Sequence, residues 1–268
     1  MKIAGMQLAI ENVHTKQTQI QHMQRIKKLA EQFYELQDGF DFLVLPELST
    51  ISYGDQSFQN LAELTNSNDS IVHQTFQELS QKLNCAICYG YPYEKDGSYY
   101  IRQTVLSHEG EELVHYDKIH IAQFEASSEK NYFSRGNSLT TFELNGWKFG
   151  MIICYDIRFP EMIRTLALKE KVDVIVHPVA FFKDQSFPSW HSFVVTRALE
   201  NQVYFLSLNQ AGKHFGNSIF CPPWVDFNQD PTIYGEDETL KTFTLEHSLI
   251  ESVRKHYPLR DDKLAEYK

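Results

Sequence analysis

Amphipathic and apolar segments alternate along most of the chain. Between residues 15 and 37, apolar side chains recur every three or four positions, which predicts a helix with one buried face. Similar spacings predict three more helices, the first of them capped by Asp69 or Ser70 and the next begun by Pro160. The predicted helices cover about residues 15–37, 70–83, 160–169 and 188–201.

Short apolar runs between these helices predict strands. Several runs are apolar at nearly every position, which is typical of sheets that helices cover. Two of them are separated only by His108-Glu109-Gly110-Glu111 and predict a hairpin. The predicted strands are 3–10, 42–45, 85–91, 102–107, 112–115, 149–154, 172–177 and 203–209. We therefore expect an α/β fold of two mixed sheets with helices outside, and, since no repeat or linker interrupts it, a single domain over residues 1–268.

Composition and charge narrow the functional classes. The 268 residues are 42% hydrophobic, which is ample for a core, and their formal net charge is −10. Because no run of basic residues occurs, nucleic acid and anionic membrane surfaces are poor partners. The sequence contains no stretch of about 18 apolar residues and no apolar secretory signal at its start. We expect a soluble, cytoplasmic protein.

The four cysteines fit a reducing compartment. Cys85 and Cys88 have the CxxC spacing of zinc and redox sites, but they lie in an apolar run, and no second CxxC or histidine pair completes a tetrahedral site. We interpret both as core residues, since cysteine is small and often buried.

Three polar side chains stand where predicted strands end. Cys154 closes an apolar run just before the helix that Pro160 begins, Glu47 follows a second run and Lys118 a third. A thiol with an ordinary pKa of about 8.5 needs a base or a positive neighbour to act as a nucleophile. Because ligands gather beyond the carboxyl ends of strands in α/β sheets, Glu47 as base and Lys118 as cation are expected to meet Cys154 in one pocket. Taken singly, each also has a structural interpretation, as a core cysteine, a turn glutamate or a solvated lysine.

In this order and spacing, the segments around these residues closely resemble the nitrilase superfamily of carbon-nitrogen hydrolases. The N-terminal strand 2–7, the segment 190–204 and a final helix at 249–258 are also similar to the family, so the resemblance covers nearly the whole chain. The segments that carry the chemistry are Leu45-Pro46-Glu47-Leu48, Tyr116-Asp117-Lys118-Ile119-His120 and Ile153-Cys154-Tyr155-Asp156-Ile157-Arg158-Phe159-Pro160-Glu161.

The resemblance implies a four-layer α-β-β-α sandwich and acyl transfer from nitrogen to water. Cys154 attacks the amide carbon, and Glu47 takes the thiol proton and delivers it to the departing amine. Lys118 and the backbone N–H of Tyr155 stabilise the oxyanion. The resemblance implies no metal and no organic cofactor, a small-molecule substrate, and a homodimer that pairs through the helices near the nucleophile.

The family also carries a second glutamate between the lysine and the cysteine. Glu125 and Glu129 compete for this position. Glu129 precedes Gly136 by seven residues, as the family's glutamate precedes its glycine-containing turn, so we favour Glu129.

Further residues near the expected site are candidates for substrate binding. Arg158 binds either a substrate carboxylate or a group within its own fold. Tyr53 and Phe181 follow predicted strands and are expected to shape the pocket, together with Tyr155 beside the nucleophile. His191 lies near the start of the fourth predicted helix, and it either lines the pocket or serves as a structural histidine.

The chain departs from the family after Asn209-Gln210-Ala211-Gly212. Pro222-Pro223-Trp224 stands where the family has Pro-Gly, in a turn expected near the pocket rim. The short chain favours the stand-alone amidases, and a small carboxylate-bearing amide is the leading substrate class, as for an ω-amidase. Nitrile hydrolysis and N-carbamoyl hydrolysis by the same residues are alternatives. A thiol enzyme with His120 or His191 as base and a non-catalytic binding protein are weaker alternatives.

Overall fold

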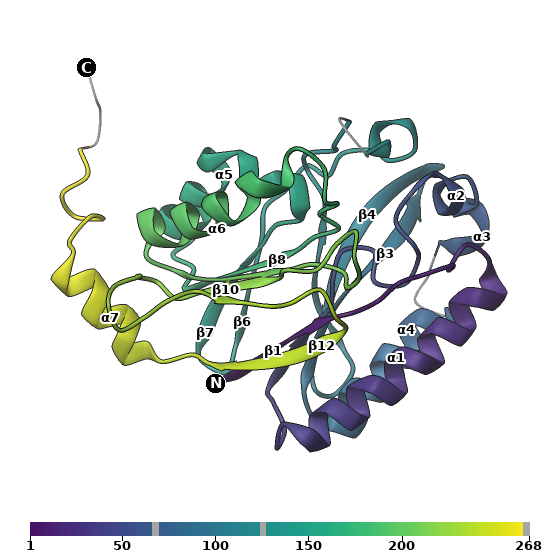
Figure 1. Cartoon of the computed structure of the whole chain (residues 1–268), viewed down its shortest axis with the longest axis horizontal. Helices are drawn as coiled ribbons and strands as arrows, with labels where there is room; N and C mark the ends of the chain where they lie inside the picture. The colour runs from purple at the N-terminus through teal and green to yellow at the C-terminus, as the bar shows by residue number, and fades with distance from the viewer. Residues whose placement is uncertain (66–69, 124–126, 265–268) are drawn as a thin grey trace.

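Two mixed sheets form the centre of the molecule, as predicted. The computed structural model describes residues 1–65, 70–123 and 127–264 (Figure 1). Within these ranges each sheet has six strands. The first sheet has the order β12 (Thr239–Thr244), β1 (Lys2–Gln7), β2 (Phe42–Val44), β3 (Ala86–Lys95), β4 (Ser98–Leu106), β5 (Glu112–Asp117). The second has the order β11 (Thr232–Ile233), β10 (Ile219–Cys221), β9 (Tyr204–Leu208), β8 (Val174–Pro178), β7 (Trp147–Met151), β6 (Thr140–Leu144).

The pairing is similar in the two sheets. In the first sheet β1, β2 and β3 are parallel, and β12, β4 and β5 join them in antiparallel pairs. In the second sheet β7, β8 and β9 are parallel, with β6, β10 and β11 antiparallel at the sides. The predicted hairpin is present as β4 and β5, with a register shift between Val105 and Leu106.

Helices cover the outer face of each sheet, which gives the predicted four layers (Figure 1). α1 (Lys16–Leu36) and α4 (Ile71–Leu83) lie over the first sheet. α5 (Pro160–Arg164), the π turn Thr165–Lys169 and α6 (Phe187–Asn201) lie over the second. The remaining helices are α2 (Asp55–Phe58), α3 (Leu61–Leu64), α7 (His247–His256) and the 3₁₀ turns Glu129–Asn131 and Cys154–Arg158. In the described part of the chain, no helix is long and apolar enough to cross a membrane.

The helix boundaries follow the capping signals of the sequence. α1 begins after Thr15, whose hydroxyl accepts the N–H of Thr18. The hydroxyl of Ser70 caps α4 by accepting the N–H of His73 at 3.3 Å, and Asp69, the other predicted cap, lies outside the described residues. Pro160 occupies the first turn of α5, where its missing N–H costs nothing.

Alternate residues of the first sheet belong to different apolar clusters. Phe42 and Val44 join the cluster between the two sheets, whereas Leu43 joins the cluster beneath α1 and α4. The same alternation places Cys88 between the sheets and Cys85 beneath the helices, as expected for positions three apart in extended chain. The CxxC pair is therefore two core residues on opposite faces and not a paired site.

The strands that the sequence did not predict lie at sheet edges or are very short. β6, β11 and β12 are edge strands, and β10 has three residues. An edge strand is partly exposed, so its polar residues hide the apolar run that reveals a central strand. The apolar positions of the central strands were sufficient to predict the layers but not the width of the sheets.

Candidate active site

Cys154 is the first residue of the 3₁₀ turn Cys154–Arg158, which follows β7. β7 ends at Met151, and Cys154 has a φ of +43°, in the left-handed region that non-glycine residues rarely adopt. Such a conformation costs on the order of 1–3 kcal/mol and persists only where surrounding contacts hold it. The strained turn presents the thiol at the end of a buried strand, as the sequence predicted.

Asp156 holds this turn. One carboxylate oxygen accepts the backbone N–H of Ile153 at 2.9 Å and the hydroxyl of Tyr116 at 2.7 Å. The other accepts the backbone N–H of His120 at 2.9 Å. Because Tyr116 and His120 flank Lys118 in the chain, Asp156 fixes the turn that carries Cys154 against the segment that carries the lysine.

Glu47 and Lys118 meet in a fully buried ion pair behind Cys154. Glu47 follows β2 and Lys118 follows β5, and the Lys118 Nζ lies 2.7 Å from one carboxylate oxygen of Glu47. The second oxygen of Glu47 accepts the backbone N–H of Ala180 at 2.9 Å. Both carboxylate oxygens of Glu47 are thus held, one by a charge and one by the backbone after β8.

Glu129 is the second glutamate of the cluster. Its carboxylate oxygens lie 2.7 and 2.9 Å from the Lys118 Nζ. They also accept the Tyr53 hydroxyl at 2.6 Å and the backbone N–H of Ala122 at 3.0 Å. Glu125, the alternative, lies outside the described residues. The placement of Glu129 against Lys118 supports the preference for it.

Burial and like charge determine the protonation of the cluster. Burial raises the pKa of Glu47 to about 7, because desolvation and the Glu129 carboxylate together outweigh Lys118. Burial by itself lowers the pKa of Lys118, but the two glutamates raise it well above its ordinary value, so the lysine stays charged. Burial and the Glu47 carboxylate raise the pKa of the Cys154 thiol, and Lys118 only partly opposes them. The resting state therefore contains a neutral thiol beside a carboxylate that accepts a proton near pH 7.

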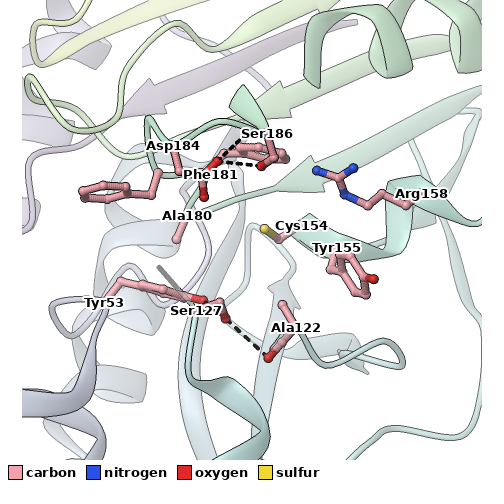
Figure 2. Close-up of a pocket in the computed structure, with 11 residues that line it drawn as sticks. Tyr53, Ala122, Ser127, Cys154, Tyr155, Arg158, Ala180, Phe181, Asp184 and Ser186 are labelled. Atoms are coloured by element: carbon pink, nitrogen blue, oxygen red, sulfur yellow. Dashed lines mark hydrogen bonds between the residues drawn. The ribbon is translucent and has the colours of Figure 1, made fainter. Parts of the chain in front are cut away.

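A small cavity opens in front of Cys154. Figure 2 shows the Cys154 sulfur in the middle of its lining, with Ala180 and Phe181 on one side and Tyr53 on the other. Glu47, Lys118 and Glu129 are fully buried, whereas Cys154 is 9% exposed, so the charges lie behind the thiol and away from solvent. The described residues that line the cavity are Tyr53, Ala122, Ser127, Cys154, Tyr155, Arg158, Ala180, Phe181, Phe182, Asp184 and Ser186.

Four of the five predicted substrate-binding residues line this cavity. They are Tyr53, Tyr155, Arg158 and Phe181. Burial and the Glu129 carboxylate raise the pKa of Tyr53 well above its ordinary value, so its hydroxyl remains a donor.

His191 lies outside the lining that the described residues form. Its Nε2 is 2.7 Å from the carbonyl oxygen of Asn217, and burial lowers its pKa. The structural interpretation of this histidine fits its position.

The loop after β8 supplies groups that the sequence did not predict. The N–H of Ala180 donates to Glu47, and it lowers the pKa of the Cys154 thiol against the larger effect of burial. The side chain of Asn209 clamps the next residue, accepting the N–H of Phe181 and donating to its carbonyl oxygen, both at 2.9 Å. The role of Ala180 could not be predicted from the sequence, because a backbone N–H donor does not depend on the type of side chain.

Other predicted features lie elsewhere. His120, one alternative base, has its Nδ1 2.8 Å from Asp156 and its ring stacked on Phe159. Trp224, expected near the rim, stacks on Tyr257 beyond α7 with ring centroids 3.9 Å apart and is not among the described residues that line the cavity. No group of three His, Cys, Asp or Glu side chains suited to a metal ion occurs in the residues that the structure describes.

Known proteins share both the sequence and the fold of this chain. The model of the family described as Carbon-nitrogen hydrolase matches residues 2–255. The 2-oxoglutaramate amidase of Bacillus subtilis (strain 168) is 30% identical over 246 residues, which cover 89% of this chain and 91% of the relative. Omega-amidase NIT2 of Xenopus tropicalis is 28% identical over 239 residues, covering 84% and 83%. The crystal structure of Saccharomyces cerevisiae Nit3, a member of branch 10 of the nitrilase superfamily, has a TM-score of 0.86 and 25% identity and covers 100% of this chain and 97% of Nit3.

Proposed function

The chain belongs to the carbon-nitrogen hydrolase family, and from this premise we propose that it hydrolyses a small carboxylate-bearing amide through a thioester on Cys154. Its class, an amidase-type carbon-nitrogen hydrolase, agrees with the resemblance found in the sequence. One observation carries the proposed chemistry: a buried carboxylate with a pKa of about 7 is paired with a lysine, and both charges act on a thiol that stands on a strained turn.

Acylation begins from the neutral thiol. Glu47 removes the thiol proton as the sulfur attacks the amide carbon, so a carbon–sulfur bond forms and the carbonyl becomes an oxyanion. Glu47 then gives the proton to the amide nitrogen, the carbon–nitrogen bond breaks, and ammonia or an amine leaves. The products of this half-reaction are the amine and a Cys154 thioester.

The charge of the cluster stays constant through this step. Before attack, Glu47 and Glu129 are ionised against one Lys118. After proton transfer Glu47 is neutral, and the negative charge is on the oxyanion, where Lys118 and the Tyr155 N–H stabilise it. Glu129 holds Lys118 in place through both carboxylate oxygens.

Deacylation reverses the roles. Glu47 removes a proton from water, the hydroxide adds to the thioester carbon, and the carbon–sulfur bond breaks. The proton returns to the thiolate, and a carboxylic acid leaves. The proposal assigns no metal and no organic cofactor to either half-reaction.

The cavity lining supports a short acyl chain that ends in a carboxylate. Arg158 is the cation among the described lining residues, and it lies about 5.8 Å from the Phe181 ring and 5.9 Å from the Tyr155 ring. An arginine forms paired hydrogen bonds with a carboxylate, so it selects an anionic end on the substrate. Tyr53, Tyr155 and Phe181 form walls around the chain that links this end to the amide.

An amide panel with paired variants tests the substrate class. We expect ammonia release from succinamate and much less from butyramide, its neutral counterpart. Arg158→Met is expected to lower kcat/KM for succinamate by about 10- to 100-fold, the loss of one charged hydrogen-bonded contact, and to leave butyramide unchanged. Arg164→Met is the matched control, since Arg164 pairs with Glu200 at 3.8 Å. Hydrolysis of nitriles or N-carbamoyl compounds in place of the amides, or of no member of the panel, would refute the proposal.

We also propose that the chain forms a homodimer through the helices near the nucleophile. The family resemblance is the support for this, and α5 and α6 are the helices concerned. Sedimentation equilibrium is expected to give twice the chain mass of 31.3 kDa, and a monomer across the micromolar range would contradict the proposal.

A further inference from the structure

A buried chain of hydrogen bonds leads from the second sheet to the backbone of the nucleophile. The carbonyl oxygen of Cys154 lies 2.9 Å from His177 Nε2, on the neighbouring strand β8. His177 Nδ1 lies 2.8 Å from the Ser207 hydroxyl on β9, and that hydroxyl accepts Trp190 Nε1–H at 2.9 Å. His177, Ser207 and Trp190 are all fully buried.

The two ends of the chain of hydrogen bonds fix their direction. A carbonyl oxygen only accepts, so His177 carries a proton on Nε2 and donates it to the Cys154 carbonyl. An indole N–H only donates, so the Ser207 oxygen accepts from Trp190. In a neutral His177 ring Nδ1 then has no proton, and it accepts the proton of the Ser207 hydroxyl. Burial lowers the pKa of His177 to about 4, so the ring remains neutral at working pH.

The bond acts on a peptide group that the reaction uses. The Cys154 carbonyl and the Tyr155 N–H belong to one peptide unit, and no peptide bond among the described residues is cis. In a trans unit the N–H points away from the carbonyl oxygen. Holding the carbonyl on the His177 side therefore aims the Tyr155 N–H to the opposite side, and the φ of +43° at Cys154 shows that this turn needs such support.

We infer that His177, oriented by Ser207 and Trp190, is a positioning residue that aims the Tyr155 N–H at the oxyanion of the tetrahedral intermediate. This role rests on the proposed function, because it requires an oxyanion at that place. The Trp190 ring also stacks on Phe181 at 5.2 Å and 10°, so the same chain supports one wall of the cavity.

Two reactions of the same thiol separate this role from a general structural one. Amide hydrolysis passes through an oxyanion, whereas alkylation of Cys154 by iodoacetamide displaces iodide at a saturated carbon and forms none. His177→Phe is expected to lower kcat for the best amide by about 10- to 100-fold, below the 10²–10³ for complete loss of an oxyanion donor, with KM little changed. The alkylation rate of Cys154 is expected to stay within about twofold, because thiol and base are untouched.

Further variants keep the test informative if His177→Phe folds poorly. His177→Gln retains an N–H donor and is expected to recover most of the activity, and Ser207→Ala is expected to lose part of it. Tyr234→Phe is the control for the loss of a buried hydrogen bond to a backbone carbonyl, since its hydroxyl bonds to the Gly5 oxygen at 3.0 Å, and it should leave both rates unchanged.

Equal losses of hydrolysis and alkylation in His177→Phe, or no loss of either, would overturn the positioning role while leaving the proposed function intact. Wild-type protein that is alkylated at Cys154 but hydrolyses no amide would overturn the proposed function, and this role with it.

Discussion

The two sheets contribute different kinds of group to the site. The first sheet supplies buried charged side chains, Glu47 after β2 and Lys118 after β5, and every carboxylate oxygen of Glu47 and Glu129 has a donor. The second sheet supplies Cys154, the proposed nucleophile, on a strained turn after β7, and the Ala180 N–H after β8. The charges are therefore fixed before substrate arrives, and the reacting atoms lie on the other side, facing the cavity.

This division explains why the thiol needs a base. Burial and the Glu47 carboxylate raise the pKa of the Cys154 thiol more than Lys118 lowers it, so a thiolate is disfavoured. Burial also raises the pKa of Glu47 to about 7, which makes it a proton acceptor of suitable strength.

Removing the base from the first sheet should have the largest effect. Glu47→Gln keeps the shape of the side chain but cannot take the thiol proton. We expect kcat/KM for the amide to fall by about 10²- to 10⁴-fold, the usual contribution of a general base. Steady-state ammonia release measures this, with circular dichroism as the control for folding. Retention of more than a tenth of wild-type activity would mean that another group is the base.

Removing the cation should damage stability as well as activity. Lys118→Met leaves Glu47 and Glu129 buried without their partner, which is expected to cost about 3–5 kcal/mol of unfolding free energy. Urea denaturation measures the loss, and Lys118→Met combined with Glu129→Gln should regain part of it without regaining turnover. Lys27→Met, which breaks an exposed pair with Glu78 at 2.7 Å, is the control and should cost at most about 1 kcal/mol. A similar cost for both lysines would contradict the buried-cluster account.

A smaller effect is expected from the second glutamate, where Glu129 and Glu125 are the two candidates. Glu129→Gln keeps hydrogen bonds but weakens the hold on Lys118, so we expect a loss of about 10- to 100-fold in kcat. Glu125→Gln should leave turnover unchanged. Loss of turnover in Glu125→Gln alone would show that the assignment of Glu129 is wrong.

The pH dependence should reflect the raised pKa of Glu47. Below about pH 7 this carboxyl is protonated and cannot act as base, so kcat/KM should rise with pH and level off above 7. Stability should change in the opposite sense. A raised acid pKa favours the folded state below the ordinary value near 4.5, and this contribution is lost as pH rises through about 7. The titration belongs to the coupled cluster as a whole. A rate profile that is flat between about pH 5 and 8 would contradict the assignment of Glu47 as the base.

The smallest effect is expected from a cysteine of the first sheet. Burial raises the pKa of Cys88 to about 12, and its sulfur accepts a hydrogen bond from the Gln103 amide at 3.3 Å. Cys88→Ala should leave turnover unchanged and cost about 1–2 kcal/mol of stability. Loss of turnover in a variant that folds normally would mean that Cys88 has a functional role, although Cys85 and Cys88 lie on opposite faces of the sheet.

The sequence was sufficient for the side chains and insufficient for the backbone groups. Glu47, Lys118 and Cys154 stand at strand ends, so the position of each follows from its own short segment. Ala180 and Glu47 are 133 residues apart, and no sequence pattern near either residue predicts their contact. The tautomer of His177 depends in the same way on the Cys154 carbonyl, which lies on another element.

The fold divides along a similar line. Central strands such as β8 and β9 are apolar at nearly every position and were predicted, whereas the edge strands β6 and β12 carry polar residues that mask them. Asp156 is the clearest omission from the site, because an acid two residues after the nucleophile is exposed on most turns. Here it is fully buried and accepts hydrogen bonds from two segments.

The pH dependence of Cys154 alkylation by iodoacetamide, compared in wild-type protein and Glu47→Gln, tests the central claim most directly, and it requires no knowledge of the substrate. If Glu47 activates a neutral thiol, the wild-type rate should rise about tenfold per pH unit up to about pH 7 and then level off. The Glu47→Gln rate at pH 7 should be at least about tenfold lower and still be rising above pH 9. Equal rates in the two proteins, independent of pH from about 5 to 9, would mean that Cys154 is already a thiolate and that the buried cluster does not serve as its base.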